Sequence, residues 1–116
     1  MKIVFHVDEN PKWTLGLDNI KNALNYFKDN NEEDYEIALV ANSTAVKEFE
    51  DISDYEEVHK KIRDLKSDKV KFYACRNALK GNGISESDII EEIEIVPAGV
   101  IKLGQLQDEG FGYIKP

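Results

Sequence analysis

The sequence predicts an α/β fold: a single-domain, three-layer sandwich with a mainly parallel five-stranded sheet and helices on both faces. Two observations support this prediction. Short apolar runs alternate along the chain with segments of helical periodicity, in the order β-α-β-α-α-β-α-β-α-β. Strands separated by helical crossovers pair in parallel, and a parallel sheet is covered on both faces. The 116 residues leave room for one domain, residues 1–116.

The first half of the chain predicts two strands and three helical segments. Lys2–Val7 and Tyr35–Ala41 are rich in Ile, Val, Leu and Phe, which is typical of buried strands. Between them, Asn10 is expected to cap a helix with Pro11 in its first position and an apolar stripe that runs from Trp13 to Phe27. Asn42 and Ser53 are expected to cap the next two helices, the second of which has Val58, Ile62 and Leu65 as its apolar stripe and His59 at the surface.

The second half predicts three strands, separated by helical segments. Cys75 ends the third strand, and a short helix follows it. The expected elements are a strand over Val70–Ala74, a short helix over Arg76–Lys80, a helical turn over Ser85–Ile90, a strand over Ile93–Val96, a helix over Ala98–Glu109 and a strand over Phe111–Ile114. The final strand is expected at an edge of the sheet, where its apolar residues would benefit from cover by a second copy of the chain.

Composition excludes several classes of function. With 15 Lys and Arg against 23 Asp and Glu, the net charge is −8, which disfavours nucleic acid and anionic membrane surfaces as partners. The single cysteine excludes an internal disulfide, and two isolated histidines give no metal-site spacing, so neither a metal nor another cofactor is expected. No apolar run is long enough to span a bilayer and the start is unlike a signal peptide, so we expect a cytoplasmic protein.

The ends of the predicted strands carry the candidate site residues. In open parallel sheets, sites form beyond the carboxyl ends of the strands. The polar residues expected there are His6, Asn42, Cys75, Arg76 and Asn77.

Cys75 is the candidate for chemistry. At the start of a helix, free backbone N–H groups and the positive helix end favour a thiolate, and Arg76 adds a nearby cation. The alternative interpretation is that Cys75 is a small buried hydrophobic residue, as free cysteines often are. For His6 we expect a hydrogen bond to backbone rather than catalysis, and for Asn42 a helix cap rather than ligand binding.

The segment Phe72-Tyr73-Ala74-Cys75-Arg76-Asn77-Ala78-Leu79, followed by Gly83-Ile84, resembles the cysteine segment of DsrE/DsrF-like proteins. Two further stretches resemble the C-terminal block of the same family: Val96-Pro97-Ala98-Gly99-Val100 and Gln107-Asp108-Glu109-Gly110-Phe111-Gly112-Tyr113-Ile114-Lys115-Pro116. The opening Ile3-Val4-Phe5-His6-Val7-Asp8 and Val40-Ala41-Asn42 also match, so the resemblance covers nearly the whole chain.

This resemblance implies a DsrE-type α/β fold, assembly into trimers or hexamers, and a sulfur-relay function. Some members carry a persulfide on a cysteine at the place that Cys75 occupies, receive the sulfur from a donor protein and pass it to an acceptor. We therefore expect a sulfur carrier or sulfurtransferase-type protein, with Arg76, Asn77, Asn42 and His6 supporting Cys75. The alternatives are a non-enzymatic oligomeric binding or structural protein with a packed Cys75, and a thiol redox sensor.

Overall fold

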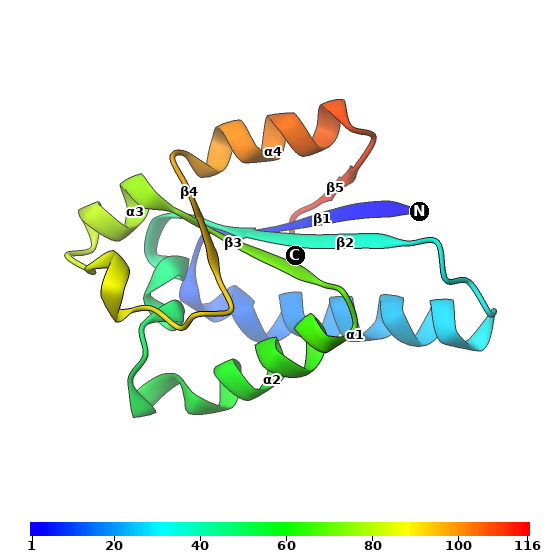
Figure 1. The fold of residues 1–116 in the computed structure, drawn as a ribbon, viewed down its shortest axis with the longest axis horizontal. Helices are drawn as coiled ribbons and strands as arrows, with labels where there is room; N and C mark the ends of the chain where they lie inside the picture. Colours follow the sequence, from blue (N-terminus) through cyan, green and yellow to red (C-terminus); the bar gives the residue numbers. More distant parts are fainter.

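The computed structural model describes residues 1–116 and contains one five-stranded sheet in the order β4-β3-β2-β1-β5, with every pairing parallel (Figure 1). The strands are β1 (Lys2–Val7), β2 (Glu36–Ala41), β3 (Lys71–Cys75), β4 (Glu94–Val96) and β5 (Gly112–Ile114). The α-helices are α1 (Trp13–Asp29), α2 (Glu56–Ser67), α3 (Arg76–Gly81) and α4 (Gly99–Asp108). The predicted fold class is confirmed, and β5 forms an edge strand because it pairs only with β1.

Four short 3-10 helices connect these elements. They are η1 (Asn10–Lys12), η2 (Ser43–Phe49), η3 (Ser53–Tyr55) and η4 (Glu86–Asp88). The segment after β2 is therefore the 3-10 helix η2 rather than an α-helix. None of the helices is long and apolar enough to cross a membrane.

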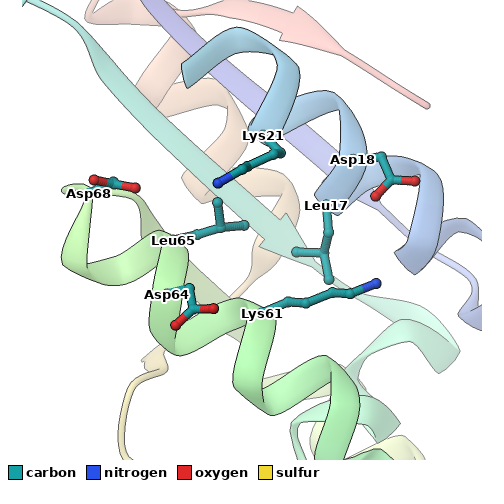
Figure 2. Close-up of a pocket in the computed structure, with 7 residues that line it drawn as sticks. All are labelled: Leu17, Asp18, Lys21, Lys61, Asp64, Leu65 and Asp68. Carbon is teal, nitrogen blue, oxygen red and sulfur yellow. The ribbon is translucent and has the colours of Figure 1, made fainter. Parts of the chain in front are cut away.

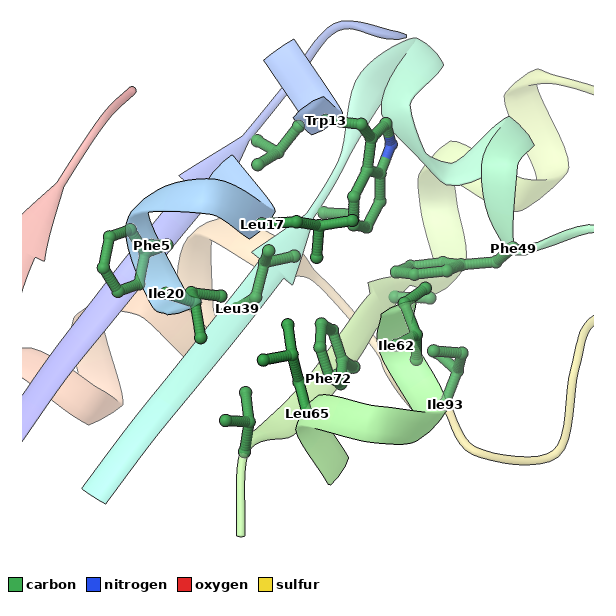
Figure 3. Packing of buried hydrophobic residues seen from close by; sticks show 14 of the residues in the cluster. Phe5, Trp13, Leu17, Ile20, Leu39, Phe49, Ile62, Leu65, Phe72 and Ile93 are labelled. Atoms are coloured by element: carbon green, nitrogen blue, oxygen red, sulfur yellow. The ribbon is translucent and has the colours of Figure 1, made fainter. Parts of the chain in front are cut away.

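The two faces of the sheet bury separate apolar clusters. Helices α1 and α2 lie on one face and α4 lies on the other (Figure 1). The cluster beneath α1 and α2 holds 22 buried residues, and Figure 3 shows Trp13, Phe49 and Phe72 among them. The cluster beneath α4 holds only 8. Each fully buried large side chain contributes roughly 1.5–3 kcal/mol, so most of the apolar stabilisation comes from the α1–α2 face.

Strand pleating determines which residues reach the α4 face at the carboxyl ends of the strands. Val4, Val40 and Tyr73 belong to the cluster beneath α4. Successive side chains in a strand alternate between faces. The residues two positions further on, which are His6, Asn42 and Cys75, therefore share the α4 face, at the carboxyl edge of β1, β2 and β3.

The helix caps predicted at Asn10 and Ser53 are wrong. Glu9 and Ile52 occupy the N-cap positions where Asn10 and Ser53 were expected to act, and neither short helix has a side-chain cap. With its NH2 group turned toward η2, the Asn10 amide donates to the Thr44 carbonyl oxygen at 2.7 Å and to Glu48 Oε2 at 3.3 Å. These hydrogen bonds hold η1 against η2, and they engage the amide that was expected to cap the helix.

His59 was expected at the surface, but only 3% of the residue is exposed. Its Nε2 lies 2.8 Å from the backbone oxygen of Glu48 and donates a hydrogen bond to it. The hydrogen bond satisfies the ring inside the α2–η2 contact, so an imidazole is tolerated beside the apolar stripe of α2.

Candidate functional site

Cys75 is the last residue of β3 and the N-cap of α3, with φ −71° and ψ 117°. Only 7% of the residue is exposed, yet it belongs to neither apolar cluster of the protein. The thiol is therefore buried at the carboxyl edge of the sheet, between two helix starts.

The second of these helix starts is the N-terminus of α4. A Cβ placed on Gly99, the first residue of α4, would lie 3.2 Å from the Cβ of Cys75 and 3.3 Å from the Cβ of Asn42. The absence of a side chain at Gly99 lets the ten-residue α4 begin directly against both residues. The first backbone N–H groups of a helix have no partner within it, and they carry partial positive charge. This end of α4 therefore favours negative charge next to Cys75.

Asn42 borders Cys75, and His6 lies on the other side of Asn42, because β2 separates β1 from β3. His6 Nε2 lies 2.9 Å from Asn42 Oδ1, and His6 Nδ1 lies 2.5 Å from the Tyr113 hydroxyl. The prediction that His6 bonds to backbone is thus wrong, because both ring nitrogens meet side chains. Asn42 occupies the N-cap position of η2 but makes no side-chain cap, because its oxygen is engaged by His6.

The backbone around Asn42 is held on both sides. Its N–H donates to the Val7 carbonyl oxygen at 3.2 Å, which extends the pairing of β1 and β2 by one residue. Ser43, which follows, has a φ of 52°, in the left-handed region that costs free energy for a residue with a side chain. Asn82 Nδ2 donates to the Ser43 carbonyl oxygen at 3.0 Å and holds this turn.

Arg76 and Asn77 lie on the first turn of α3 but face other surroundings. Arg76 forms an ion pair with Glu86, with 2.9 Å between Arg76 Nε and Glu86 Oε2. The guanidinium is thereby directed toward η4. Asn77 is exposed at the surface next to Cys75. The structure therefore groups Cys75, Asn42 and His6, while Arg76 and Asn77 lie on the outer side of α3.

The site residues predicted from the sequence did not include two members of the site, Gly99 and Tyr113. Tyr113 is 42% exposed on the edge strand β5 and pairs in register with Val4 of β1. Its position beside His6 follows only from the strand order, which places the last strand next to the first. The Pro97-Ala98-Gly99 segment gave a signal for Gly99, because a glycine after a strand end often marks a close approach of backbone to another group.

Two cavities of the protein lie away from Cys75. A 210 Å³ cavity lies between α1 and α2, on the opposite face of the sheet from Cys75, with the charged side chains of Asp18, Lys21, Lys61 and Asp64 around it (Figure 2). A second cavity, of 330 Å³, lies beneath α4 around Lys71, and lies toward the amino ends of β2 and β3. No group of three or more His, Cys, Asp or Glu side chains is placed to hold a metal ion.

These features define a class: a small parallel α/β protein that has a buried thiol at the carboxyl edge of its sheet. Two helix starts and the Asn42 side chain border the thiol, and the His6 imidazole holds the Asn42 amide. A model of the DsrE/DsrF-like family matches residues 1–116. The chain therefore belongs to the DsrE/DsrF-like family, which is associated with sulfur relay.

Three solved structures share the fold of this chain over nearly its whole length. A protein of unknown function, MTH1491 from Methanobacterium thermoautotrophicum, is 29% identical, with a TM-score of 0.83 over 99% of this chain and 98% of its own. The ychN protein from E. coli is 20% identical, with a TM-score of 0.74 over 100% and 99% of the two chains. BT1422 from Bacteroides thetaiotaomicron, of unknown function, is 18% identical, with a TM-score of 0.69 over 99% and 94%. Among curated proteins, none matches the chain.

Proposed function

We propose that the protein is a sulfur carrier, in which Cys75 accepts a sulfur atom from a persulfide donor and passes it to an acceptor thiol. The observation that carries this proposal is the position of Cys75 between the starts of α3 and α4, beside the Asn42 amide. Both helix starts favour negative charge, and the reaction places negative charge on sulfur at each stage. Membership in a family associated with sulfur relay supports the same function.

The chemistry needs no external oxidant or reductant. The Cys75 thiolate attacks the outer sulfur of a donor persulfide, R–S–SH. A bond forms between Cys75 Sγ and that sulfur, the donor S–S bond breaks, and the donor leaves as a thiolate with the electron pair. An acceptor thiolate then attacks the outer sulfur of the Cys75 persulfide. The Cys75 thiolate is regenerated as the leaving group, and the acceptor becomes the persulfide.

The chain has one cysteine, so donor and acceptor thiols must come from other molecules. Asn77 lies exposed on the first turn of α3, next to Cys75, and is placed to meet them. Arg76, fixed by Glu86, adds positive charge on the same turn. We assign these two residues to recognition of the partner proteins rather than to the reacting sulfur.

Assembly with further copies of the chain, as a trimer or hexamer, is part of this proposal. The first turn of α4 exposes Val100 to 69% and Ile101 to 60%, and β5 exposes Tyr113 and Ile114 at the sheet edge. These apolar side chains lie close to the site in sequence and fold. A second copy covering them would remove apolar surface from water.

A second function is favoured by the low exposure of Cys75. With 7% of the residue exposed, the cysteine can serve as packing, and the protein would then be a non-enzymatic oligomeric binding protein. The two functions differ in whether a sulfur reagent reaches the thiol of the folded protein.

Intact mass spectrometry after incubation with inorganic polysulfide tests the sulfur carrier. We expect the reduced protein to gain the mass of one sulfur atom, and the gain to be lost on treatment with an acceptor thiol. Cys75→Ser is the control and should gain nothing. A folded protein that gains no sulfur under conditions where its urea-unfolded form does would overturn the sulfur-carrier proposal and favour the packed cysteine.

A further inference from the structure

We propose that the Asn42 side-chain amide donates a hydrogen bond to the anionic sulfur on Cys75, and that His6 and Tyr113 are positioning residues that hold this amide in the donating orientation. The inference rests on the proposed sulfur-carrier function. It assigns the site a preference for the anionic form of the bound sulfur.

Asn42 and Cys75 are immediate neighbours. The pairing of β2 with β3 runs as far as Ala41 opposite Ala74, so the next residues, Asn42 and Cys75, follow side by side on adjacent strands. Strands in a sheet are about 4.8 Å apart. The Cβ atoms of both residues also flank the same point at Gly99, at 3.3 and 3.2 Å. An amide at Asn42 is thus within side-chain reach of a sulfur on Cys75.

The orientation of the Asn42 amide follows from its bond to His6. Oδ1 of Asn42 faces His6 Nε2 at 2.9 Å, and an amide oxygen only accepts hydrogen bonds, so Nε2 carries the proton. A neutral imidazole has one N–H, so Nδ1 is an acceptor and the Tyr113 hydroxyl donates to it at 2.5 Å. With its oxygen held by His6, Asn42 has its NH2 group free, and this group makes no hydrogen bond within the chain.

The two hydrogen bonds that link Tyr113, His6 and Asn42 have one alternative direction of donation. If His6 were protonated on Nδ1, the Tyr113 hydroxyl would accept, Nε2 would accept from the Asn42 NH2 group, and the Asn42 oxygen would face the site. A thiolate or persulfide anion on Cys75 repels that oxygen and attracts the NH2 group. Negative charge on Cys75 and a donating Tyr113 hydroxyl therefore select the same polarity, which couples β5 to the thiol through His6.

Nuclear magnetic resonance of the imidazole nitrogens tests the polarity without any sulfur reaction. Long-range 1H–15N correlations distinguish a protonated ring nitrogen from an unprotonated one. We expect His6 in the wild type to be the Nε2–H form, as for His59, whose Nε2 donates to the Glu48 carbonyl oxygen. In Tyr113→Phe we expect a mixture of the two tautomers at His6, with Tyr26→Phe on the exposed face of α1 as the matched control. A wild-type His6 protonated on Nδ1 overturns the inference.

Sulfur uptake by three variants tests the consequence for the reaction. Asn42→Ala removes the donor, and we expect the rate of uptake at neutral pH to fall about tenfold, the factor for one charge-assisted hydrogen bond. Asn42→Asp still accepts from His6 but places a carboxylate at the sulfur, so its rate should fall further. The rate of sulfur uptake by Tyr113→Phe should fall by a smaller factor. The deficit of Asn42→Ala should shrink as the pH rises, because thiolate then forms without help; a purely structural defect would persist.

The outcomes separate this inference from the proposed function. If the wild type takes up no sulfur, the sulfur-carrier proposal fails, whatever the tautomer of His6. If the wild type takes up sulfur and Asn42→Asp takes it up at the same rate, the donor role of Asn42 is wrong while the carrier function stands. Asn25→Asp, on the exposed face of α1, controls for the added charge.

Discussion

His6 Nε2 lies 2.9 Å from Asn42 Oδ1, and this contact joins the carboxyl ends of β1 and β2 on the α4 face of the sheet. Through the Tyr113 hydroxyl the same histidine reaches β5. Cys75, at the end of β3, borders the Asn42 end of this chain. Four adjacent strands thus contribute to one site at the carboxyl edge of the sheet.

Replacing Gly99 by alanine should crowd the site. The added Cβ would meet the Cβ of Cys75 at 3.2 Å, that of Asn42 at 3.3 Å and Val40 Cγ1 at 3.4 Å, all within or directly after the strands β2 and β3. We expect a loss of roughly 1–3 kcal/mol of unfolding free energy, the usual cost of overpacking. Urea denaturation measures the loss, and sulfur uptake at Cys75 should slow in parallel.

Gly104→Ala is the matched control within the same helix. A Cβ at this position meets nothing within 4 Å, and the backbone is already helical. Alanine there should stabilise the protein by about 0.5–1 kcal/mol through helix propensity, with sulfur uptake unchanged. Equal effects of the two substitutions would contradict the close approach of α4 to Cys75.

Arg76→Gln should have little effect on either stability or sulfur uptake. The guanidinium is engaged with Glu86 in a partly exposed ion pair, with 2.9 Å between the nearest atoms. Such pairs contribute about 0–1 kcal/mol. We expect thermal unfolding to shift slightly and uptake of sulfur from inorganic polysulfide to stay within about twofold, since the charge is directed toward η4. A tenfold slower uptake would show that Arg76 acts on the sulfur directly.

The fold was predictable because its signals are local. The apolar run Lys2–Val7 coincides with β1, and the stripe from Trp13 to Phe27 lies within α1. Burial of one stripe or one strand face fixes these elements whatever their neighbours. The caps were less predictable. Asn10 hydrogen-bonds to acceptors in η2 instead, because tertiary packing decides which partners lie near a polar side chain at a helix start.

The candidate site was predictable only in part. The strand-end rule correctly placed Cys75, Asn42 and His6 at one edge, because all three follow buried strands of the same parallel sheet. It gave no information on Tyr113, since β5 lies beside β1 only in the folded sheet order. Nor did it give the partner of Arg76, because Glu86 is brought to it by the turn after α3.

Ile101→Glu should reduce self-association if α4 contacts a second copy. Ile101 is 60% exposed on the first turn of α4, so the monomer tolerates a charge there. Burying an unpaired carboxylate in an interface is costly, and the oligomer should dissociate. Light scattering at micromolar concentration measures the mass. The matched control is Leu15→Glu on α1, which should leave the oligomer intact. A wild type that is monomeric would contradict assembly altogether.

The stability of the protein should fall as the pH rises toward and through neutrality, because of Glu48. Burial raises the pKa of this carboxyl from 4.5 to about 7, so the folded protein holds its proton more tightly than the unfolded chain does. Between these two values the folded state binds more protons, and the free energy of unfolding decreases with pH, by about 3 kcal/mol at most. Desolvation by burial causes the raised pKa of Glu48, and it disfavours the charged form of the carboxyl in the folded protein only.

Glu48→Gln isolates the contribution of this carboxyl. The amide keeps the shape and contacts of the protonated acid, including acceptance from Asn10, so stability at about pH 5 should be close to that of the wild type. At about pH 8 the variant should be the more stable protein, because the wild type then carries a buried carboxylate. Urea denaturation at both pH values measures the difference. If the difference in unfolding free energy between Glu48→Gln and the wild type stays constant with pH, the Glu48 carboxylate is solvated in the folded protein, for instance through opening of the η1–η2 contact.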